Sequence, residues 1–175
     1  MRGQNTLNVQ GAAGHGLVSY VVNELDWTRV VTVELHYSLG YHNFFGLTDD
    51  FCQPGDEIAE RLWVSLGNSG FRAVIAGMPD DIDATYLGVG GTDAINFLTQ
   101  YEKTSSETYR IGLSIIADKS VLNAKGSAKE SLIGTQAAYW QAADNNLPEW
   151  QAFVATYQGW SEDERFPSPS LFFAV

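Results

Sequence analysis

Carboxylate and histidine side chains near the start of the chain offer the first candidate chemistry. Glu34 and His36 alternate onto one side of an extended segment, and His42 follows six residues later. One carboxylate and two imidazoles are ligand types that a catalytic metal site uses. The spacing is less regular than a His-x-His or His-x-x-x-His pair, so Glu34 and His36 also fit a solvent-facing strand surface. A metal-dependent enzyme using Glu34, His36 and His42 is therefore one alternative.

A glycine-rich turn offers a second candidate site. Gly88, Gly90, Gly91 and Thr92 follow a predicted strand and precede a predicted helix, whose free N–H groups favour an anion. Neither Lys nor Arg is close in sequence, and Asp93 would repel an anion. The order of elements (hairpin, strand, glycine turn, helix, strand, helix) resembles that of the acyl-CoA-dependent N-acetyltransferases, although their Gln/Arg-x-x-Gly-x-Gly/Ala pattern is missing. The resemblance implies an enzyme that binds an anionic cofactor here.

Cys52 and two acidic clusters fit structural roles better than catalytic ones. Cys52 is surrounded in sequence by carboxylates, which oppose the lowered thiol pKa that a nucleophile needs, so we expect a buried apolar role. The acidic clusters at 49–57 and 80–83 lack the Asp-x-Asp-x-Asp-Gly spacing of a calcium loop. We expect these carboxylates to cap backbone N–H groups in turns.

Aromatic side chains carry the favoured functional hypothesis. The chain has 5 Trp and 8 Tyr residues, and such rings are favoured where an apolar surface meets water. The rings of the second half that could form a recognition surface are Tyr139, Trp140, Trp150, Tyr157 and Trp160. We therefore predict a non-enzymatic recognition domain that presents this surface and the acidic loops to a protein, glycan or membrane-surface target. Core packing is the competing role for most of these rings.

Charge and cysteine content limit the partners and the compartment. The net charge is −11 with 10 scattered basic residues, which excludes the basic stripe of a nucleic-acid binder. The first 16 residues lack the apolar core of a signal peptide, and no apolar run reaches the roughly 18 residues that span a bilayer. We expect a soluble protein, with Cys52 slightly favouring the cytoplasm. A homo-oligomer is left open.

Hydrophobic patterning predicts the elements that position these residues. Alternation over 28–39 predicts a central strand with one buried face and one partly wet face. A further strand is expected at 17–25 and a long loop at 40–57. The turn at 67–70, with glycine at both ends, predicts a β-hairpin between strands 58–66 and 71–77.

The second half is predicted to supply the helices. Apolar periodicity and capping residues place them near 93–103, 128–143 and 148–159. Strands are expected at 6–10, 82–89, 109–117 and in the C-terminal segment LFFAV. Together these predict an α+β fold of one domain over residues 1–175, in which helices cover a mostly antiparallel sheet.

Overall fold

A five-stranded sheet forms the centre of the computed structural model, which describes residues 17–51, 56–104, 108–112, 114–133, 135–137 and 146–161. The strand order is β2-β1-β3-β4-β5, and every neighbouring pair is parallel. The strands are β1 (Arg29–Leu35), β2 (Glu57–Val64), β3 (Ala84–Gly88), β4 (Tyr109–Gly112) and β5 (Thr135–Ala137). All amino ends therefore lie at one edge of the sheet and all carboxyl ends at the other.

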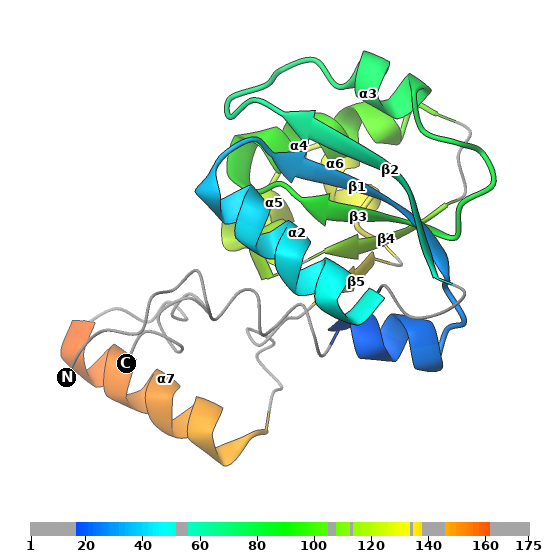
Figure 1. Cartoon of the computed structure of the whole chain (residues 1–175). Helices are drawn as coiled ribbons and strands as arrows, with labels where there is room; N and C mark the ends of the chain where they lie inside the picture. Colours follow the sequence, from blue (N-terminus) through cyan, green and yellow to red (C-terminus); the bar gives the residue numbers. More distant parts are fainter. Residues whose placement is uncertain are drawn as a thin grey trace.

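Helices cover both faces of the sheet (Figure 1). The helices are α2 (Ser38–Phe51), α3 (Arg72–Ala76), α4 (Gly91–Tyr101), α5 (Lys119–Leu122), α6 (Ser127–Glu130) and α7 (Pro148–Ser161), with a short 3₁₀ turn η1 (Ser114–Ala117) and helical residues 17–23. Helix α2 lies over one face, while α3, α4, α5 and α6 lie on the opposite side. None of the described helices is long and apolar enough to cross a membrane.

Each face has its own hydrophobic core. The core on the α2 side includes Val18, Val21, Val30, Leu47, Phe51, Ala84, Tyr86 and Ile111. The core on the α4 side includes Val31, Val33, Leu35, Phe71, Leu87, Phe97, Leu98 and Ile116. Because β1 contributes to both, it is buried on both faces, as strands of parallel sheets usually are.

The parallel sheet contradicts the predicted α+β fold with a mostly antiparallel sheet: this is an α/β fold. The hairpin at 58–77 was the main source of the error, because β2 is followed by helix α3 in place of a returning strand. The turn between them lies along α4: the Gly67 N–H donates to Asp93 Oδ2 at 2.9 Å, and the Asn96 amide donates to the Asn68 carbonyl at 3.3 Å. Gly67 has a φ of +80°, a conformation that favours glycine, and the turn leads from β2 to helix α3.

Other local predictions were also wrong. Residues 17–23 are helical, with Val18 and Val21 buried three positions apart and the residues between them exposed. The predicted loop at 40–57 contains α2, whose buried Phe44, Leu47 and Phe51 follow helical spacing. The helix predicted at 128–143 ends at Glu130, and β5 follows it.

The strongest periodic signals gave the correct element type. The helices expected near 93–103 and 148–159 are α4 and α7, and the strand expected at 82–89 is β3. The strand at 28–39 is confirmed as β1 over its first part, but neither of its faces is wet: Thr32 and Glu34 are buried with the rest. The strand predicted at 109–117 ends at Gly112. Strand 6–10 and the segment LFFAV lie outside the described residues, and the single domain over 1–175 stays a prediction.

Candidate functional site

The carboxyl edge of the sheet contains the point where the chain reverses direction across the sheet. From β1 the chain passes through α2 to β2 on one side, and from β2 through α3 to β3 on the other side of β1. In open parallel sheets, a crevice for ligands forms outside the carboxyl ends of the strands at such a switch point. The residues beside it are 36–40 after β1 and 88–93 at the end of β3.

The glycine-rich segment predicted from the sequence lies at this switch point. Gly88 ends β3, Gly90 is the extended N-cap of α4, and Gly91 begins the helix with φ +53°, where glycine is favoured. Gly90 provides no side-chain cap, so the first N–H groups of α4 lack a capping side chain of their own. Thr92 follows in the first turn and is exposed. The four predicted residues are therefore brought together at the edge where a ligand is expected.

Asp93 gives this edge a negative charge. Its side chain is buried, Oδ2 accepts from the Gly67 N–H at 2.9 Å, and Oδ1 has no partner among the described residues. Tyr37, just after β1, is near it: burial, and secondarily the Asp93 carboxylate, raise the pKa of Tyr37. No Lys or Arg occurs in 36–40, 65–70 or 88–93. The groups offered to a ligand are backbone N–H groups, a tyrosine hydroxyl and a carboxylate.

The predicted metal ligands occupy three different environments. Glu34 is completely buried in β1, whereas His36 and His42 are exposed. The Nδ1 atom of His42 lies 2.6 Å from the Ser38 carbonyl, one turn back in α2. Within the described ranges, no three His, Cys, Asp or Glu side chains lie together closely enough to hold a metal ion. The structure does not bring the proposed set together.

The predicted aromatic surface is described only in part. Tyr139 and Trp140 lie outside the described residues, Trp150 is buried, Tyr157 is half-buried, and Trp160 is 91% exposed. A different ring cluster, missed from sequence, lies where α2 meets β2. Its members are His36, Tyr41, Phe44 and Trp63, with ring centroids 5.0 to 6.1 Å apart. Helical spacing in 38–51 was the signal that could have revealed it.

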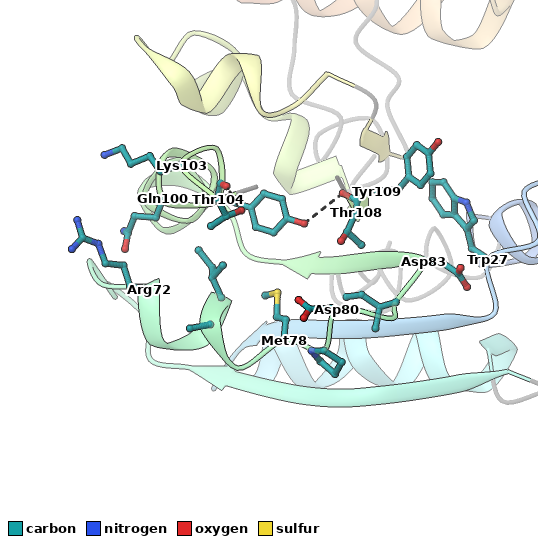
Figure 2. Close-up of a pocket in the computed structure, with 15 residues that line it drawn as sticks. Trp27, Arg72, Met78, Asp80, Asp83, Gln100, Lys103, Thr104, Thr108 and Tyr109 are labelled. Atoms are coloured by element: carbon teal, nitrogen blue, oxygen red, sulfur yellow. Dashed lines mark hydrogen bonds between the residues drawn. The ribbon is translucent and has the colours of Figure 1, made fainter. Parts of the chain in front are cut away.

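A cleft of about 1020 Å³ lies at the opposite edge, beside the amino ends of β1, β3 and β4. Figure 2 shows Arg72 and Lys103 toward one end and the Trp27 and Tyr109 rings toward the other. The two rings stack with centroids 4.7 Å apart. Volume alone would favour this cleft as the binding site.

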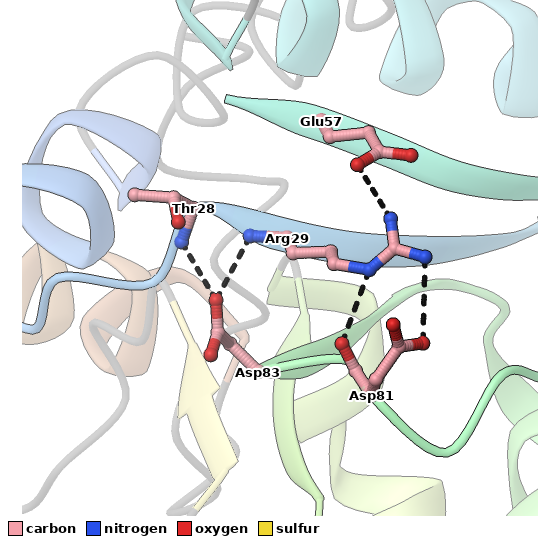
Figure 3. A network of polar contacts seen from close by, with 5 residues as sticks. All are labelled: Thr28, Arg29, Glu57, Asp81 and Asp83. Atoms are coloured by element: carbon pink, nitrogen blue, oxygen red, sulfur yellow. Dashed lines mark hydrogen bonds and ion pairs between the residues drawn. The ribbon is translucent and has the colours of Figure 1, made fainter. Parts of the chain in front are cut away.

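A network of polar contacts holds the starts of the strands together at the amino edge (Figure 3). Asp83 accepts from the backbone N–H groups of Thr28 at 2.9 Å and Arg29 at 2.8 Å, which confirms its predicted capping role. The Arg29 guanidinium pairs with Glu57 at 2.6 Å and Asp81 at 3.4 Å, and these hydrogen bonds raise its pKa. We favour the carboxyl edge because the switch point of the sheet lies there.

The fold and the sequence together identify the class of protein. The chain matches the family model described as periplasmic binding protein over residues 5–172. Because this match covers most of the sequence, the chain belongs to the periplasmic binding protein family. A search of curated proteins gave no match.

Solved structures show the same fold. An ABC transporter substrate-binding protein from Sphaerobacter thermophilus has 23% identity and a TM-score of 0.75, over 87% of this chain and 42% of that one. An ABC transporter solute-binding protein from R. palustris, in complex with benzoate, has 19% identity and a TM-score of 0.74, over 95% and 44%. A leucine binding protein from Thermotoga maritima has 16% identity and a TM-score of 0.71, over 94% and 47%. The chain thus spans less than half the length of these structures.

Family membership corrects the functional hypotheses from sequence. The favoured domain for recognising a protein, glycan or membrane surface through rings and acidic loops is contradicted by the match to the periplasmic binding protein model. The two enzymatic alternatives, acetyltransferase-like or metal-dependent, are contradicted in the same way. The turn at 88–92 in this chain follows a parallel strand in a doubly wound sheet, so its resemblance to the acetyltransferases was limited to the local order of elements.

Proposed function

We propose that this chain binds a small organic solute at the carboxyl edge of its sheet and serves an ABC transporter as a solute-binding protein. Three solved relatives support the class: two carry ABC transporter in their descriptions, and the third is described as a leucine binding protein. The observation that carries the proposal is the position of Gly88, Gly90, Gly91 and Thr92 beside the end of β1, at the switch point of the sheet.

The chemistry of this edge favours a ligand recognised through hydrogen bonds. The first N–H groups of α4 suit a carboxylate or another acceptor, because a helix N-terminus has a positive potential. The Tyr37 hydroxyl can donate or accept, and the Asp93 carboxylate can accept. A small molecule with both acceptor and donor groups fits these partners. Leucine carries both kinds of group, whereas benzoate carries acceptors alone, and both compounds, named in the descriptions of two relatives, serve as first probes.

Two exposed residues at opposite ends of α4 allow a matched test. Thr92 lies in its first turn at the carboxyl edge, and Lys103 lies just past its end, in the amino-edge cleft. The chain would be titrated with benzoate, 3,4-dihydroxybenzoate and L-leucine by calorimetry. We refer to the compound that binds as the active probe. A Trp side chain at position 92 would occupy the proposed site, so we expect Thr92→Trp to weaken binding of the active probe at least tenfold, or about 1.4 kcal/mol. Lys103→Trp should leave its affinity within about twofold. The reverse pattern, or no binding of any probe, would contradict the proposal.

A further inference from the structure

Four polar side chains lie buried between α2 and the sheet. They are Thr32 and Glu34 on β1, Asn43 on α2 and Tyr86 on β3. Within the part of the chain that the structure describes, the hydroxyl, carboxylate and amide atoms of these side chains have no hydrogen-bond partner. Such groups are rare in folded proteins, and each one requires a physical explanation.

The register of the sheet places the strand residues on one face. Thr32 pairs with Tyr86, and Glu34 pairs with Gly88 two positions further along the same strands. Residues two apart in a strand point to the same side, and Tyr86 belongs to the core beneath α2. The three strand residues therefore face α2, where Asn43 is buried one helical turn before Leu47 of the same core, and we call the four residues the α2 polar cluster.

Gly88 makes the room that Glu34 occupies. A Cβ atom built on Gly88 would overlap the Glu34 carboxyl group, so that carboxyl lies directly against the β3 backbone. Burial raises the pKa of Glu34 well above its ordinary value. Burial first, and the Glu34 carboxylate second, also raise the pKa of Tyr86, which indicates that the two groups are close.

The charged groups around the cluster do not compensate an ionised Glu34. Among the side chains that the structure describes, the titratable ones on the same face of β1 and β2, on α2 and on β3 are His36, Arg61, Tyr41, His42 and Tyr86. The first four are exposed, and the guanidinium of Arg61 lies over the Phe44 ring, 5.3 Å from its centroid. Asp49 and Asp50 occupy the last turn of α2. An unpaired buried carboxylate is costly, whereas a neutral carboxylic acid can both donate to and accept from an amide or a hydroxyl.

We propose that the α2 polar cluster is a buried proton-binding site, in which Glu34 is carried as the neutral acid at neutral pH and its proton keeps α2 packed on the sheet. Asn43 is the member of the cluster on α2, and its amide offers both the acceptor and the donors that a carboxylic acid needs. Loss of the proton to solvent leaves a carboxylate under α2, and the expected response is a looser α2. The cluster adjoins the proposed ligand edge at Gly88, but the proton site requires no ligand there.

The sign of the pH effect follows from linkage. In the unfolded chain Glu34 ionises near pH 4.3, about the value for an unperturbed glutamate, while the folded chain keeps its proton to higher pH. Between these two values the folding equilibrium constant falls about tenfold per pH unit from this group alone. The contribution is greatest in acid and becomes constant once Glu34 ionises in the folded state.

Comparison with two glutamine variants isolates this effect. Glu34→Gln keeps the shape of the side chain without a titrating proton, and Glu60→Gln is the matched control at an exposed position of β2. Unfolding by urea from pH 4 to pH 8 is expected to show the stability of Glu34→Gln relative to wild type rising with pH. The rise is about tenfold in equilibrium constant per pH unit until Glu34 ionises in the folded chain. Glu60→Gln should show no such trend. A flat difference for Glu34→Gln would overturn the proposal.

Two measurements on the wild-type chain test the proposal if Glu34→Gln does not fold. Infrared spectroscopy at pH 7 should show the carbonyl band of one protonated carboxylic acid, and hydrogen exchange of α2 amides should accelerate at high pH beyond that of α4. A Glu34 that is ionised at pH 7, with stability that depends on Na⁺ or K⁺ compared with choline, would assign the cluster to a cation instead. Either that result or uniform exchange in α2 and α4 would contradict a proton site.

Discussion

The two edges of the parallel sheet differ in how their polar groups are used. At the amino edge, the carboxylate of Asp83 and the guanidinium of Arg29 bind the starts of β1, β2 and β3 to one another. At the carboxyl edge, the N-cap Gly90 brings no side chain, and Asp93 has one oxygen without a partner among the described residues. The cleft of about 1020 Å³ lies at the amino edge, whereas the switch point of the sheet lies at the carboxyl edge. Size and topology thus point to opposite edges, and we give greater weight to the topology.

The difference has a simple origin in parallel α/β folds. Every strand enters at the amino edge from a loop that must be held in place. The helices α2 and α4, which directly follow β1 and β3, begin at the carboxyl edge with N–H groups that have no partner within the helix. The amino edge therefore accumulates structural contacts, while the carboxyl edge keeps donors for a ligand. Variants at the two edges should separate stability from binding.

The largest effect is expected at Gly40, in the first turn of α2. A Cβ atom there would overlap the carbonyl oxygen of Leu35, the last residue of β1. The added Cβ atom and the Leu35 carbonyl oxygen are both fixed by the backbone, so neither can move aside without shifting α2 or β1. Gly40→Ala should therefore lower the free energy of unfolding by about 3 kcal/mol or more, or prevent folding. Urea unfolding measures this, with Gly70→Ala as a control in open space. Equal stability of the two variants would contradict the close approach of α2 to β1.

A smaller loss is expected at Gly88, where β3 meets Glu34. Gly88→Ala should cost about 1 to 3 kcal/mol of unfolding free energy, because the Glu34 carboxyl group must move. Removing that group with Glu34→Ala should make the glycine substitution less costly. A double-mutant cycle measures the coupling, which we expect to exceed about 0.5 kcal/mol. Strict additivity would show that the two residues do not touch.

At the amino edge, Asp83→Ala should affect stability without affecting the ligand. It removes the acceptor of the Thr28 and Arg29 N–H groups, and we expect a loss of about 1 to 2 kcal/mol in unfolding free energy. Asp83→Asn, which keeps an acceptor oxygen, should lose less. Affinity for the active probe should stay within about twofold in both variants, as measured by calorimetry. A tenfold loss of affinity would place the ligand at the amino edge.

The smallest effect is expected from the stacked rings of the cleft. Tyr109→Ala removes the contact with Trp27 and should lower the free energy of unfolding by about 1 kcal/mol. Tyr109→Phe keeps the ring and should remain close to wild type. If instead Tyr109→Ala abolished binding of the probe, these rings would be ligand contacts, and the roles of the two edges would be reversed.

The sequence predicted single elements better than their arrangement. Helix α4 was predictable because Ala94, Phe97 and Leu98 repeat at helical spacing, and they are buried as that spacing requires. The direction of the strands was not predictable, because a glycine turn such as 67–70 fits both a hairpin and the start of a crossover. Long-range contacts, here from the turn to Asp93 and Asn96 of α4, decide between them.

The glycine-rich segment stays a predicted binding site, and the structure shows only where it lies in the fold. The glycines at 88, 90 and 91 indicated a close approach of backbone to a ligand, and the structure places them at the switch point. An alternating pattern placed Glu34 on a wet face, whereas the crossover helix α2 covers that face. Alternation reports which residues share a side of a strand, but only the packed fold determines whether that side meets water.

The most direct test is to map the ligand onto the chain by NMR. Amide shifts would be recorded during titration with benzoate, 3,4-dihydroxybenzoate and L-leucine, at concentrations up to the millimolar range. Our account predicts that the active probe shifts the amides of 36–40 and 88–93, at the carboxyl edge. Shifts confined to 78–83, 100–104 and 108–109, around the amino-edge cleft, would contradict it.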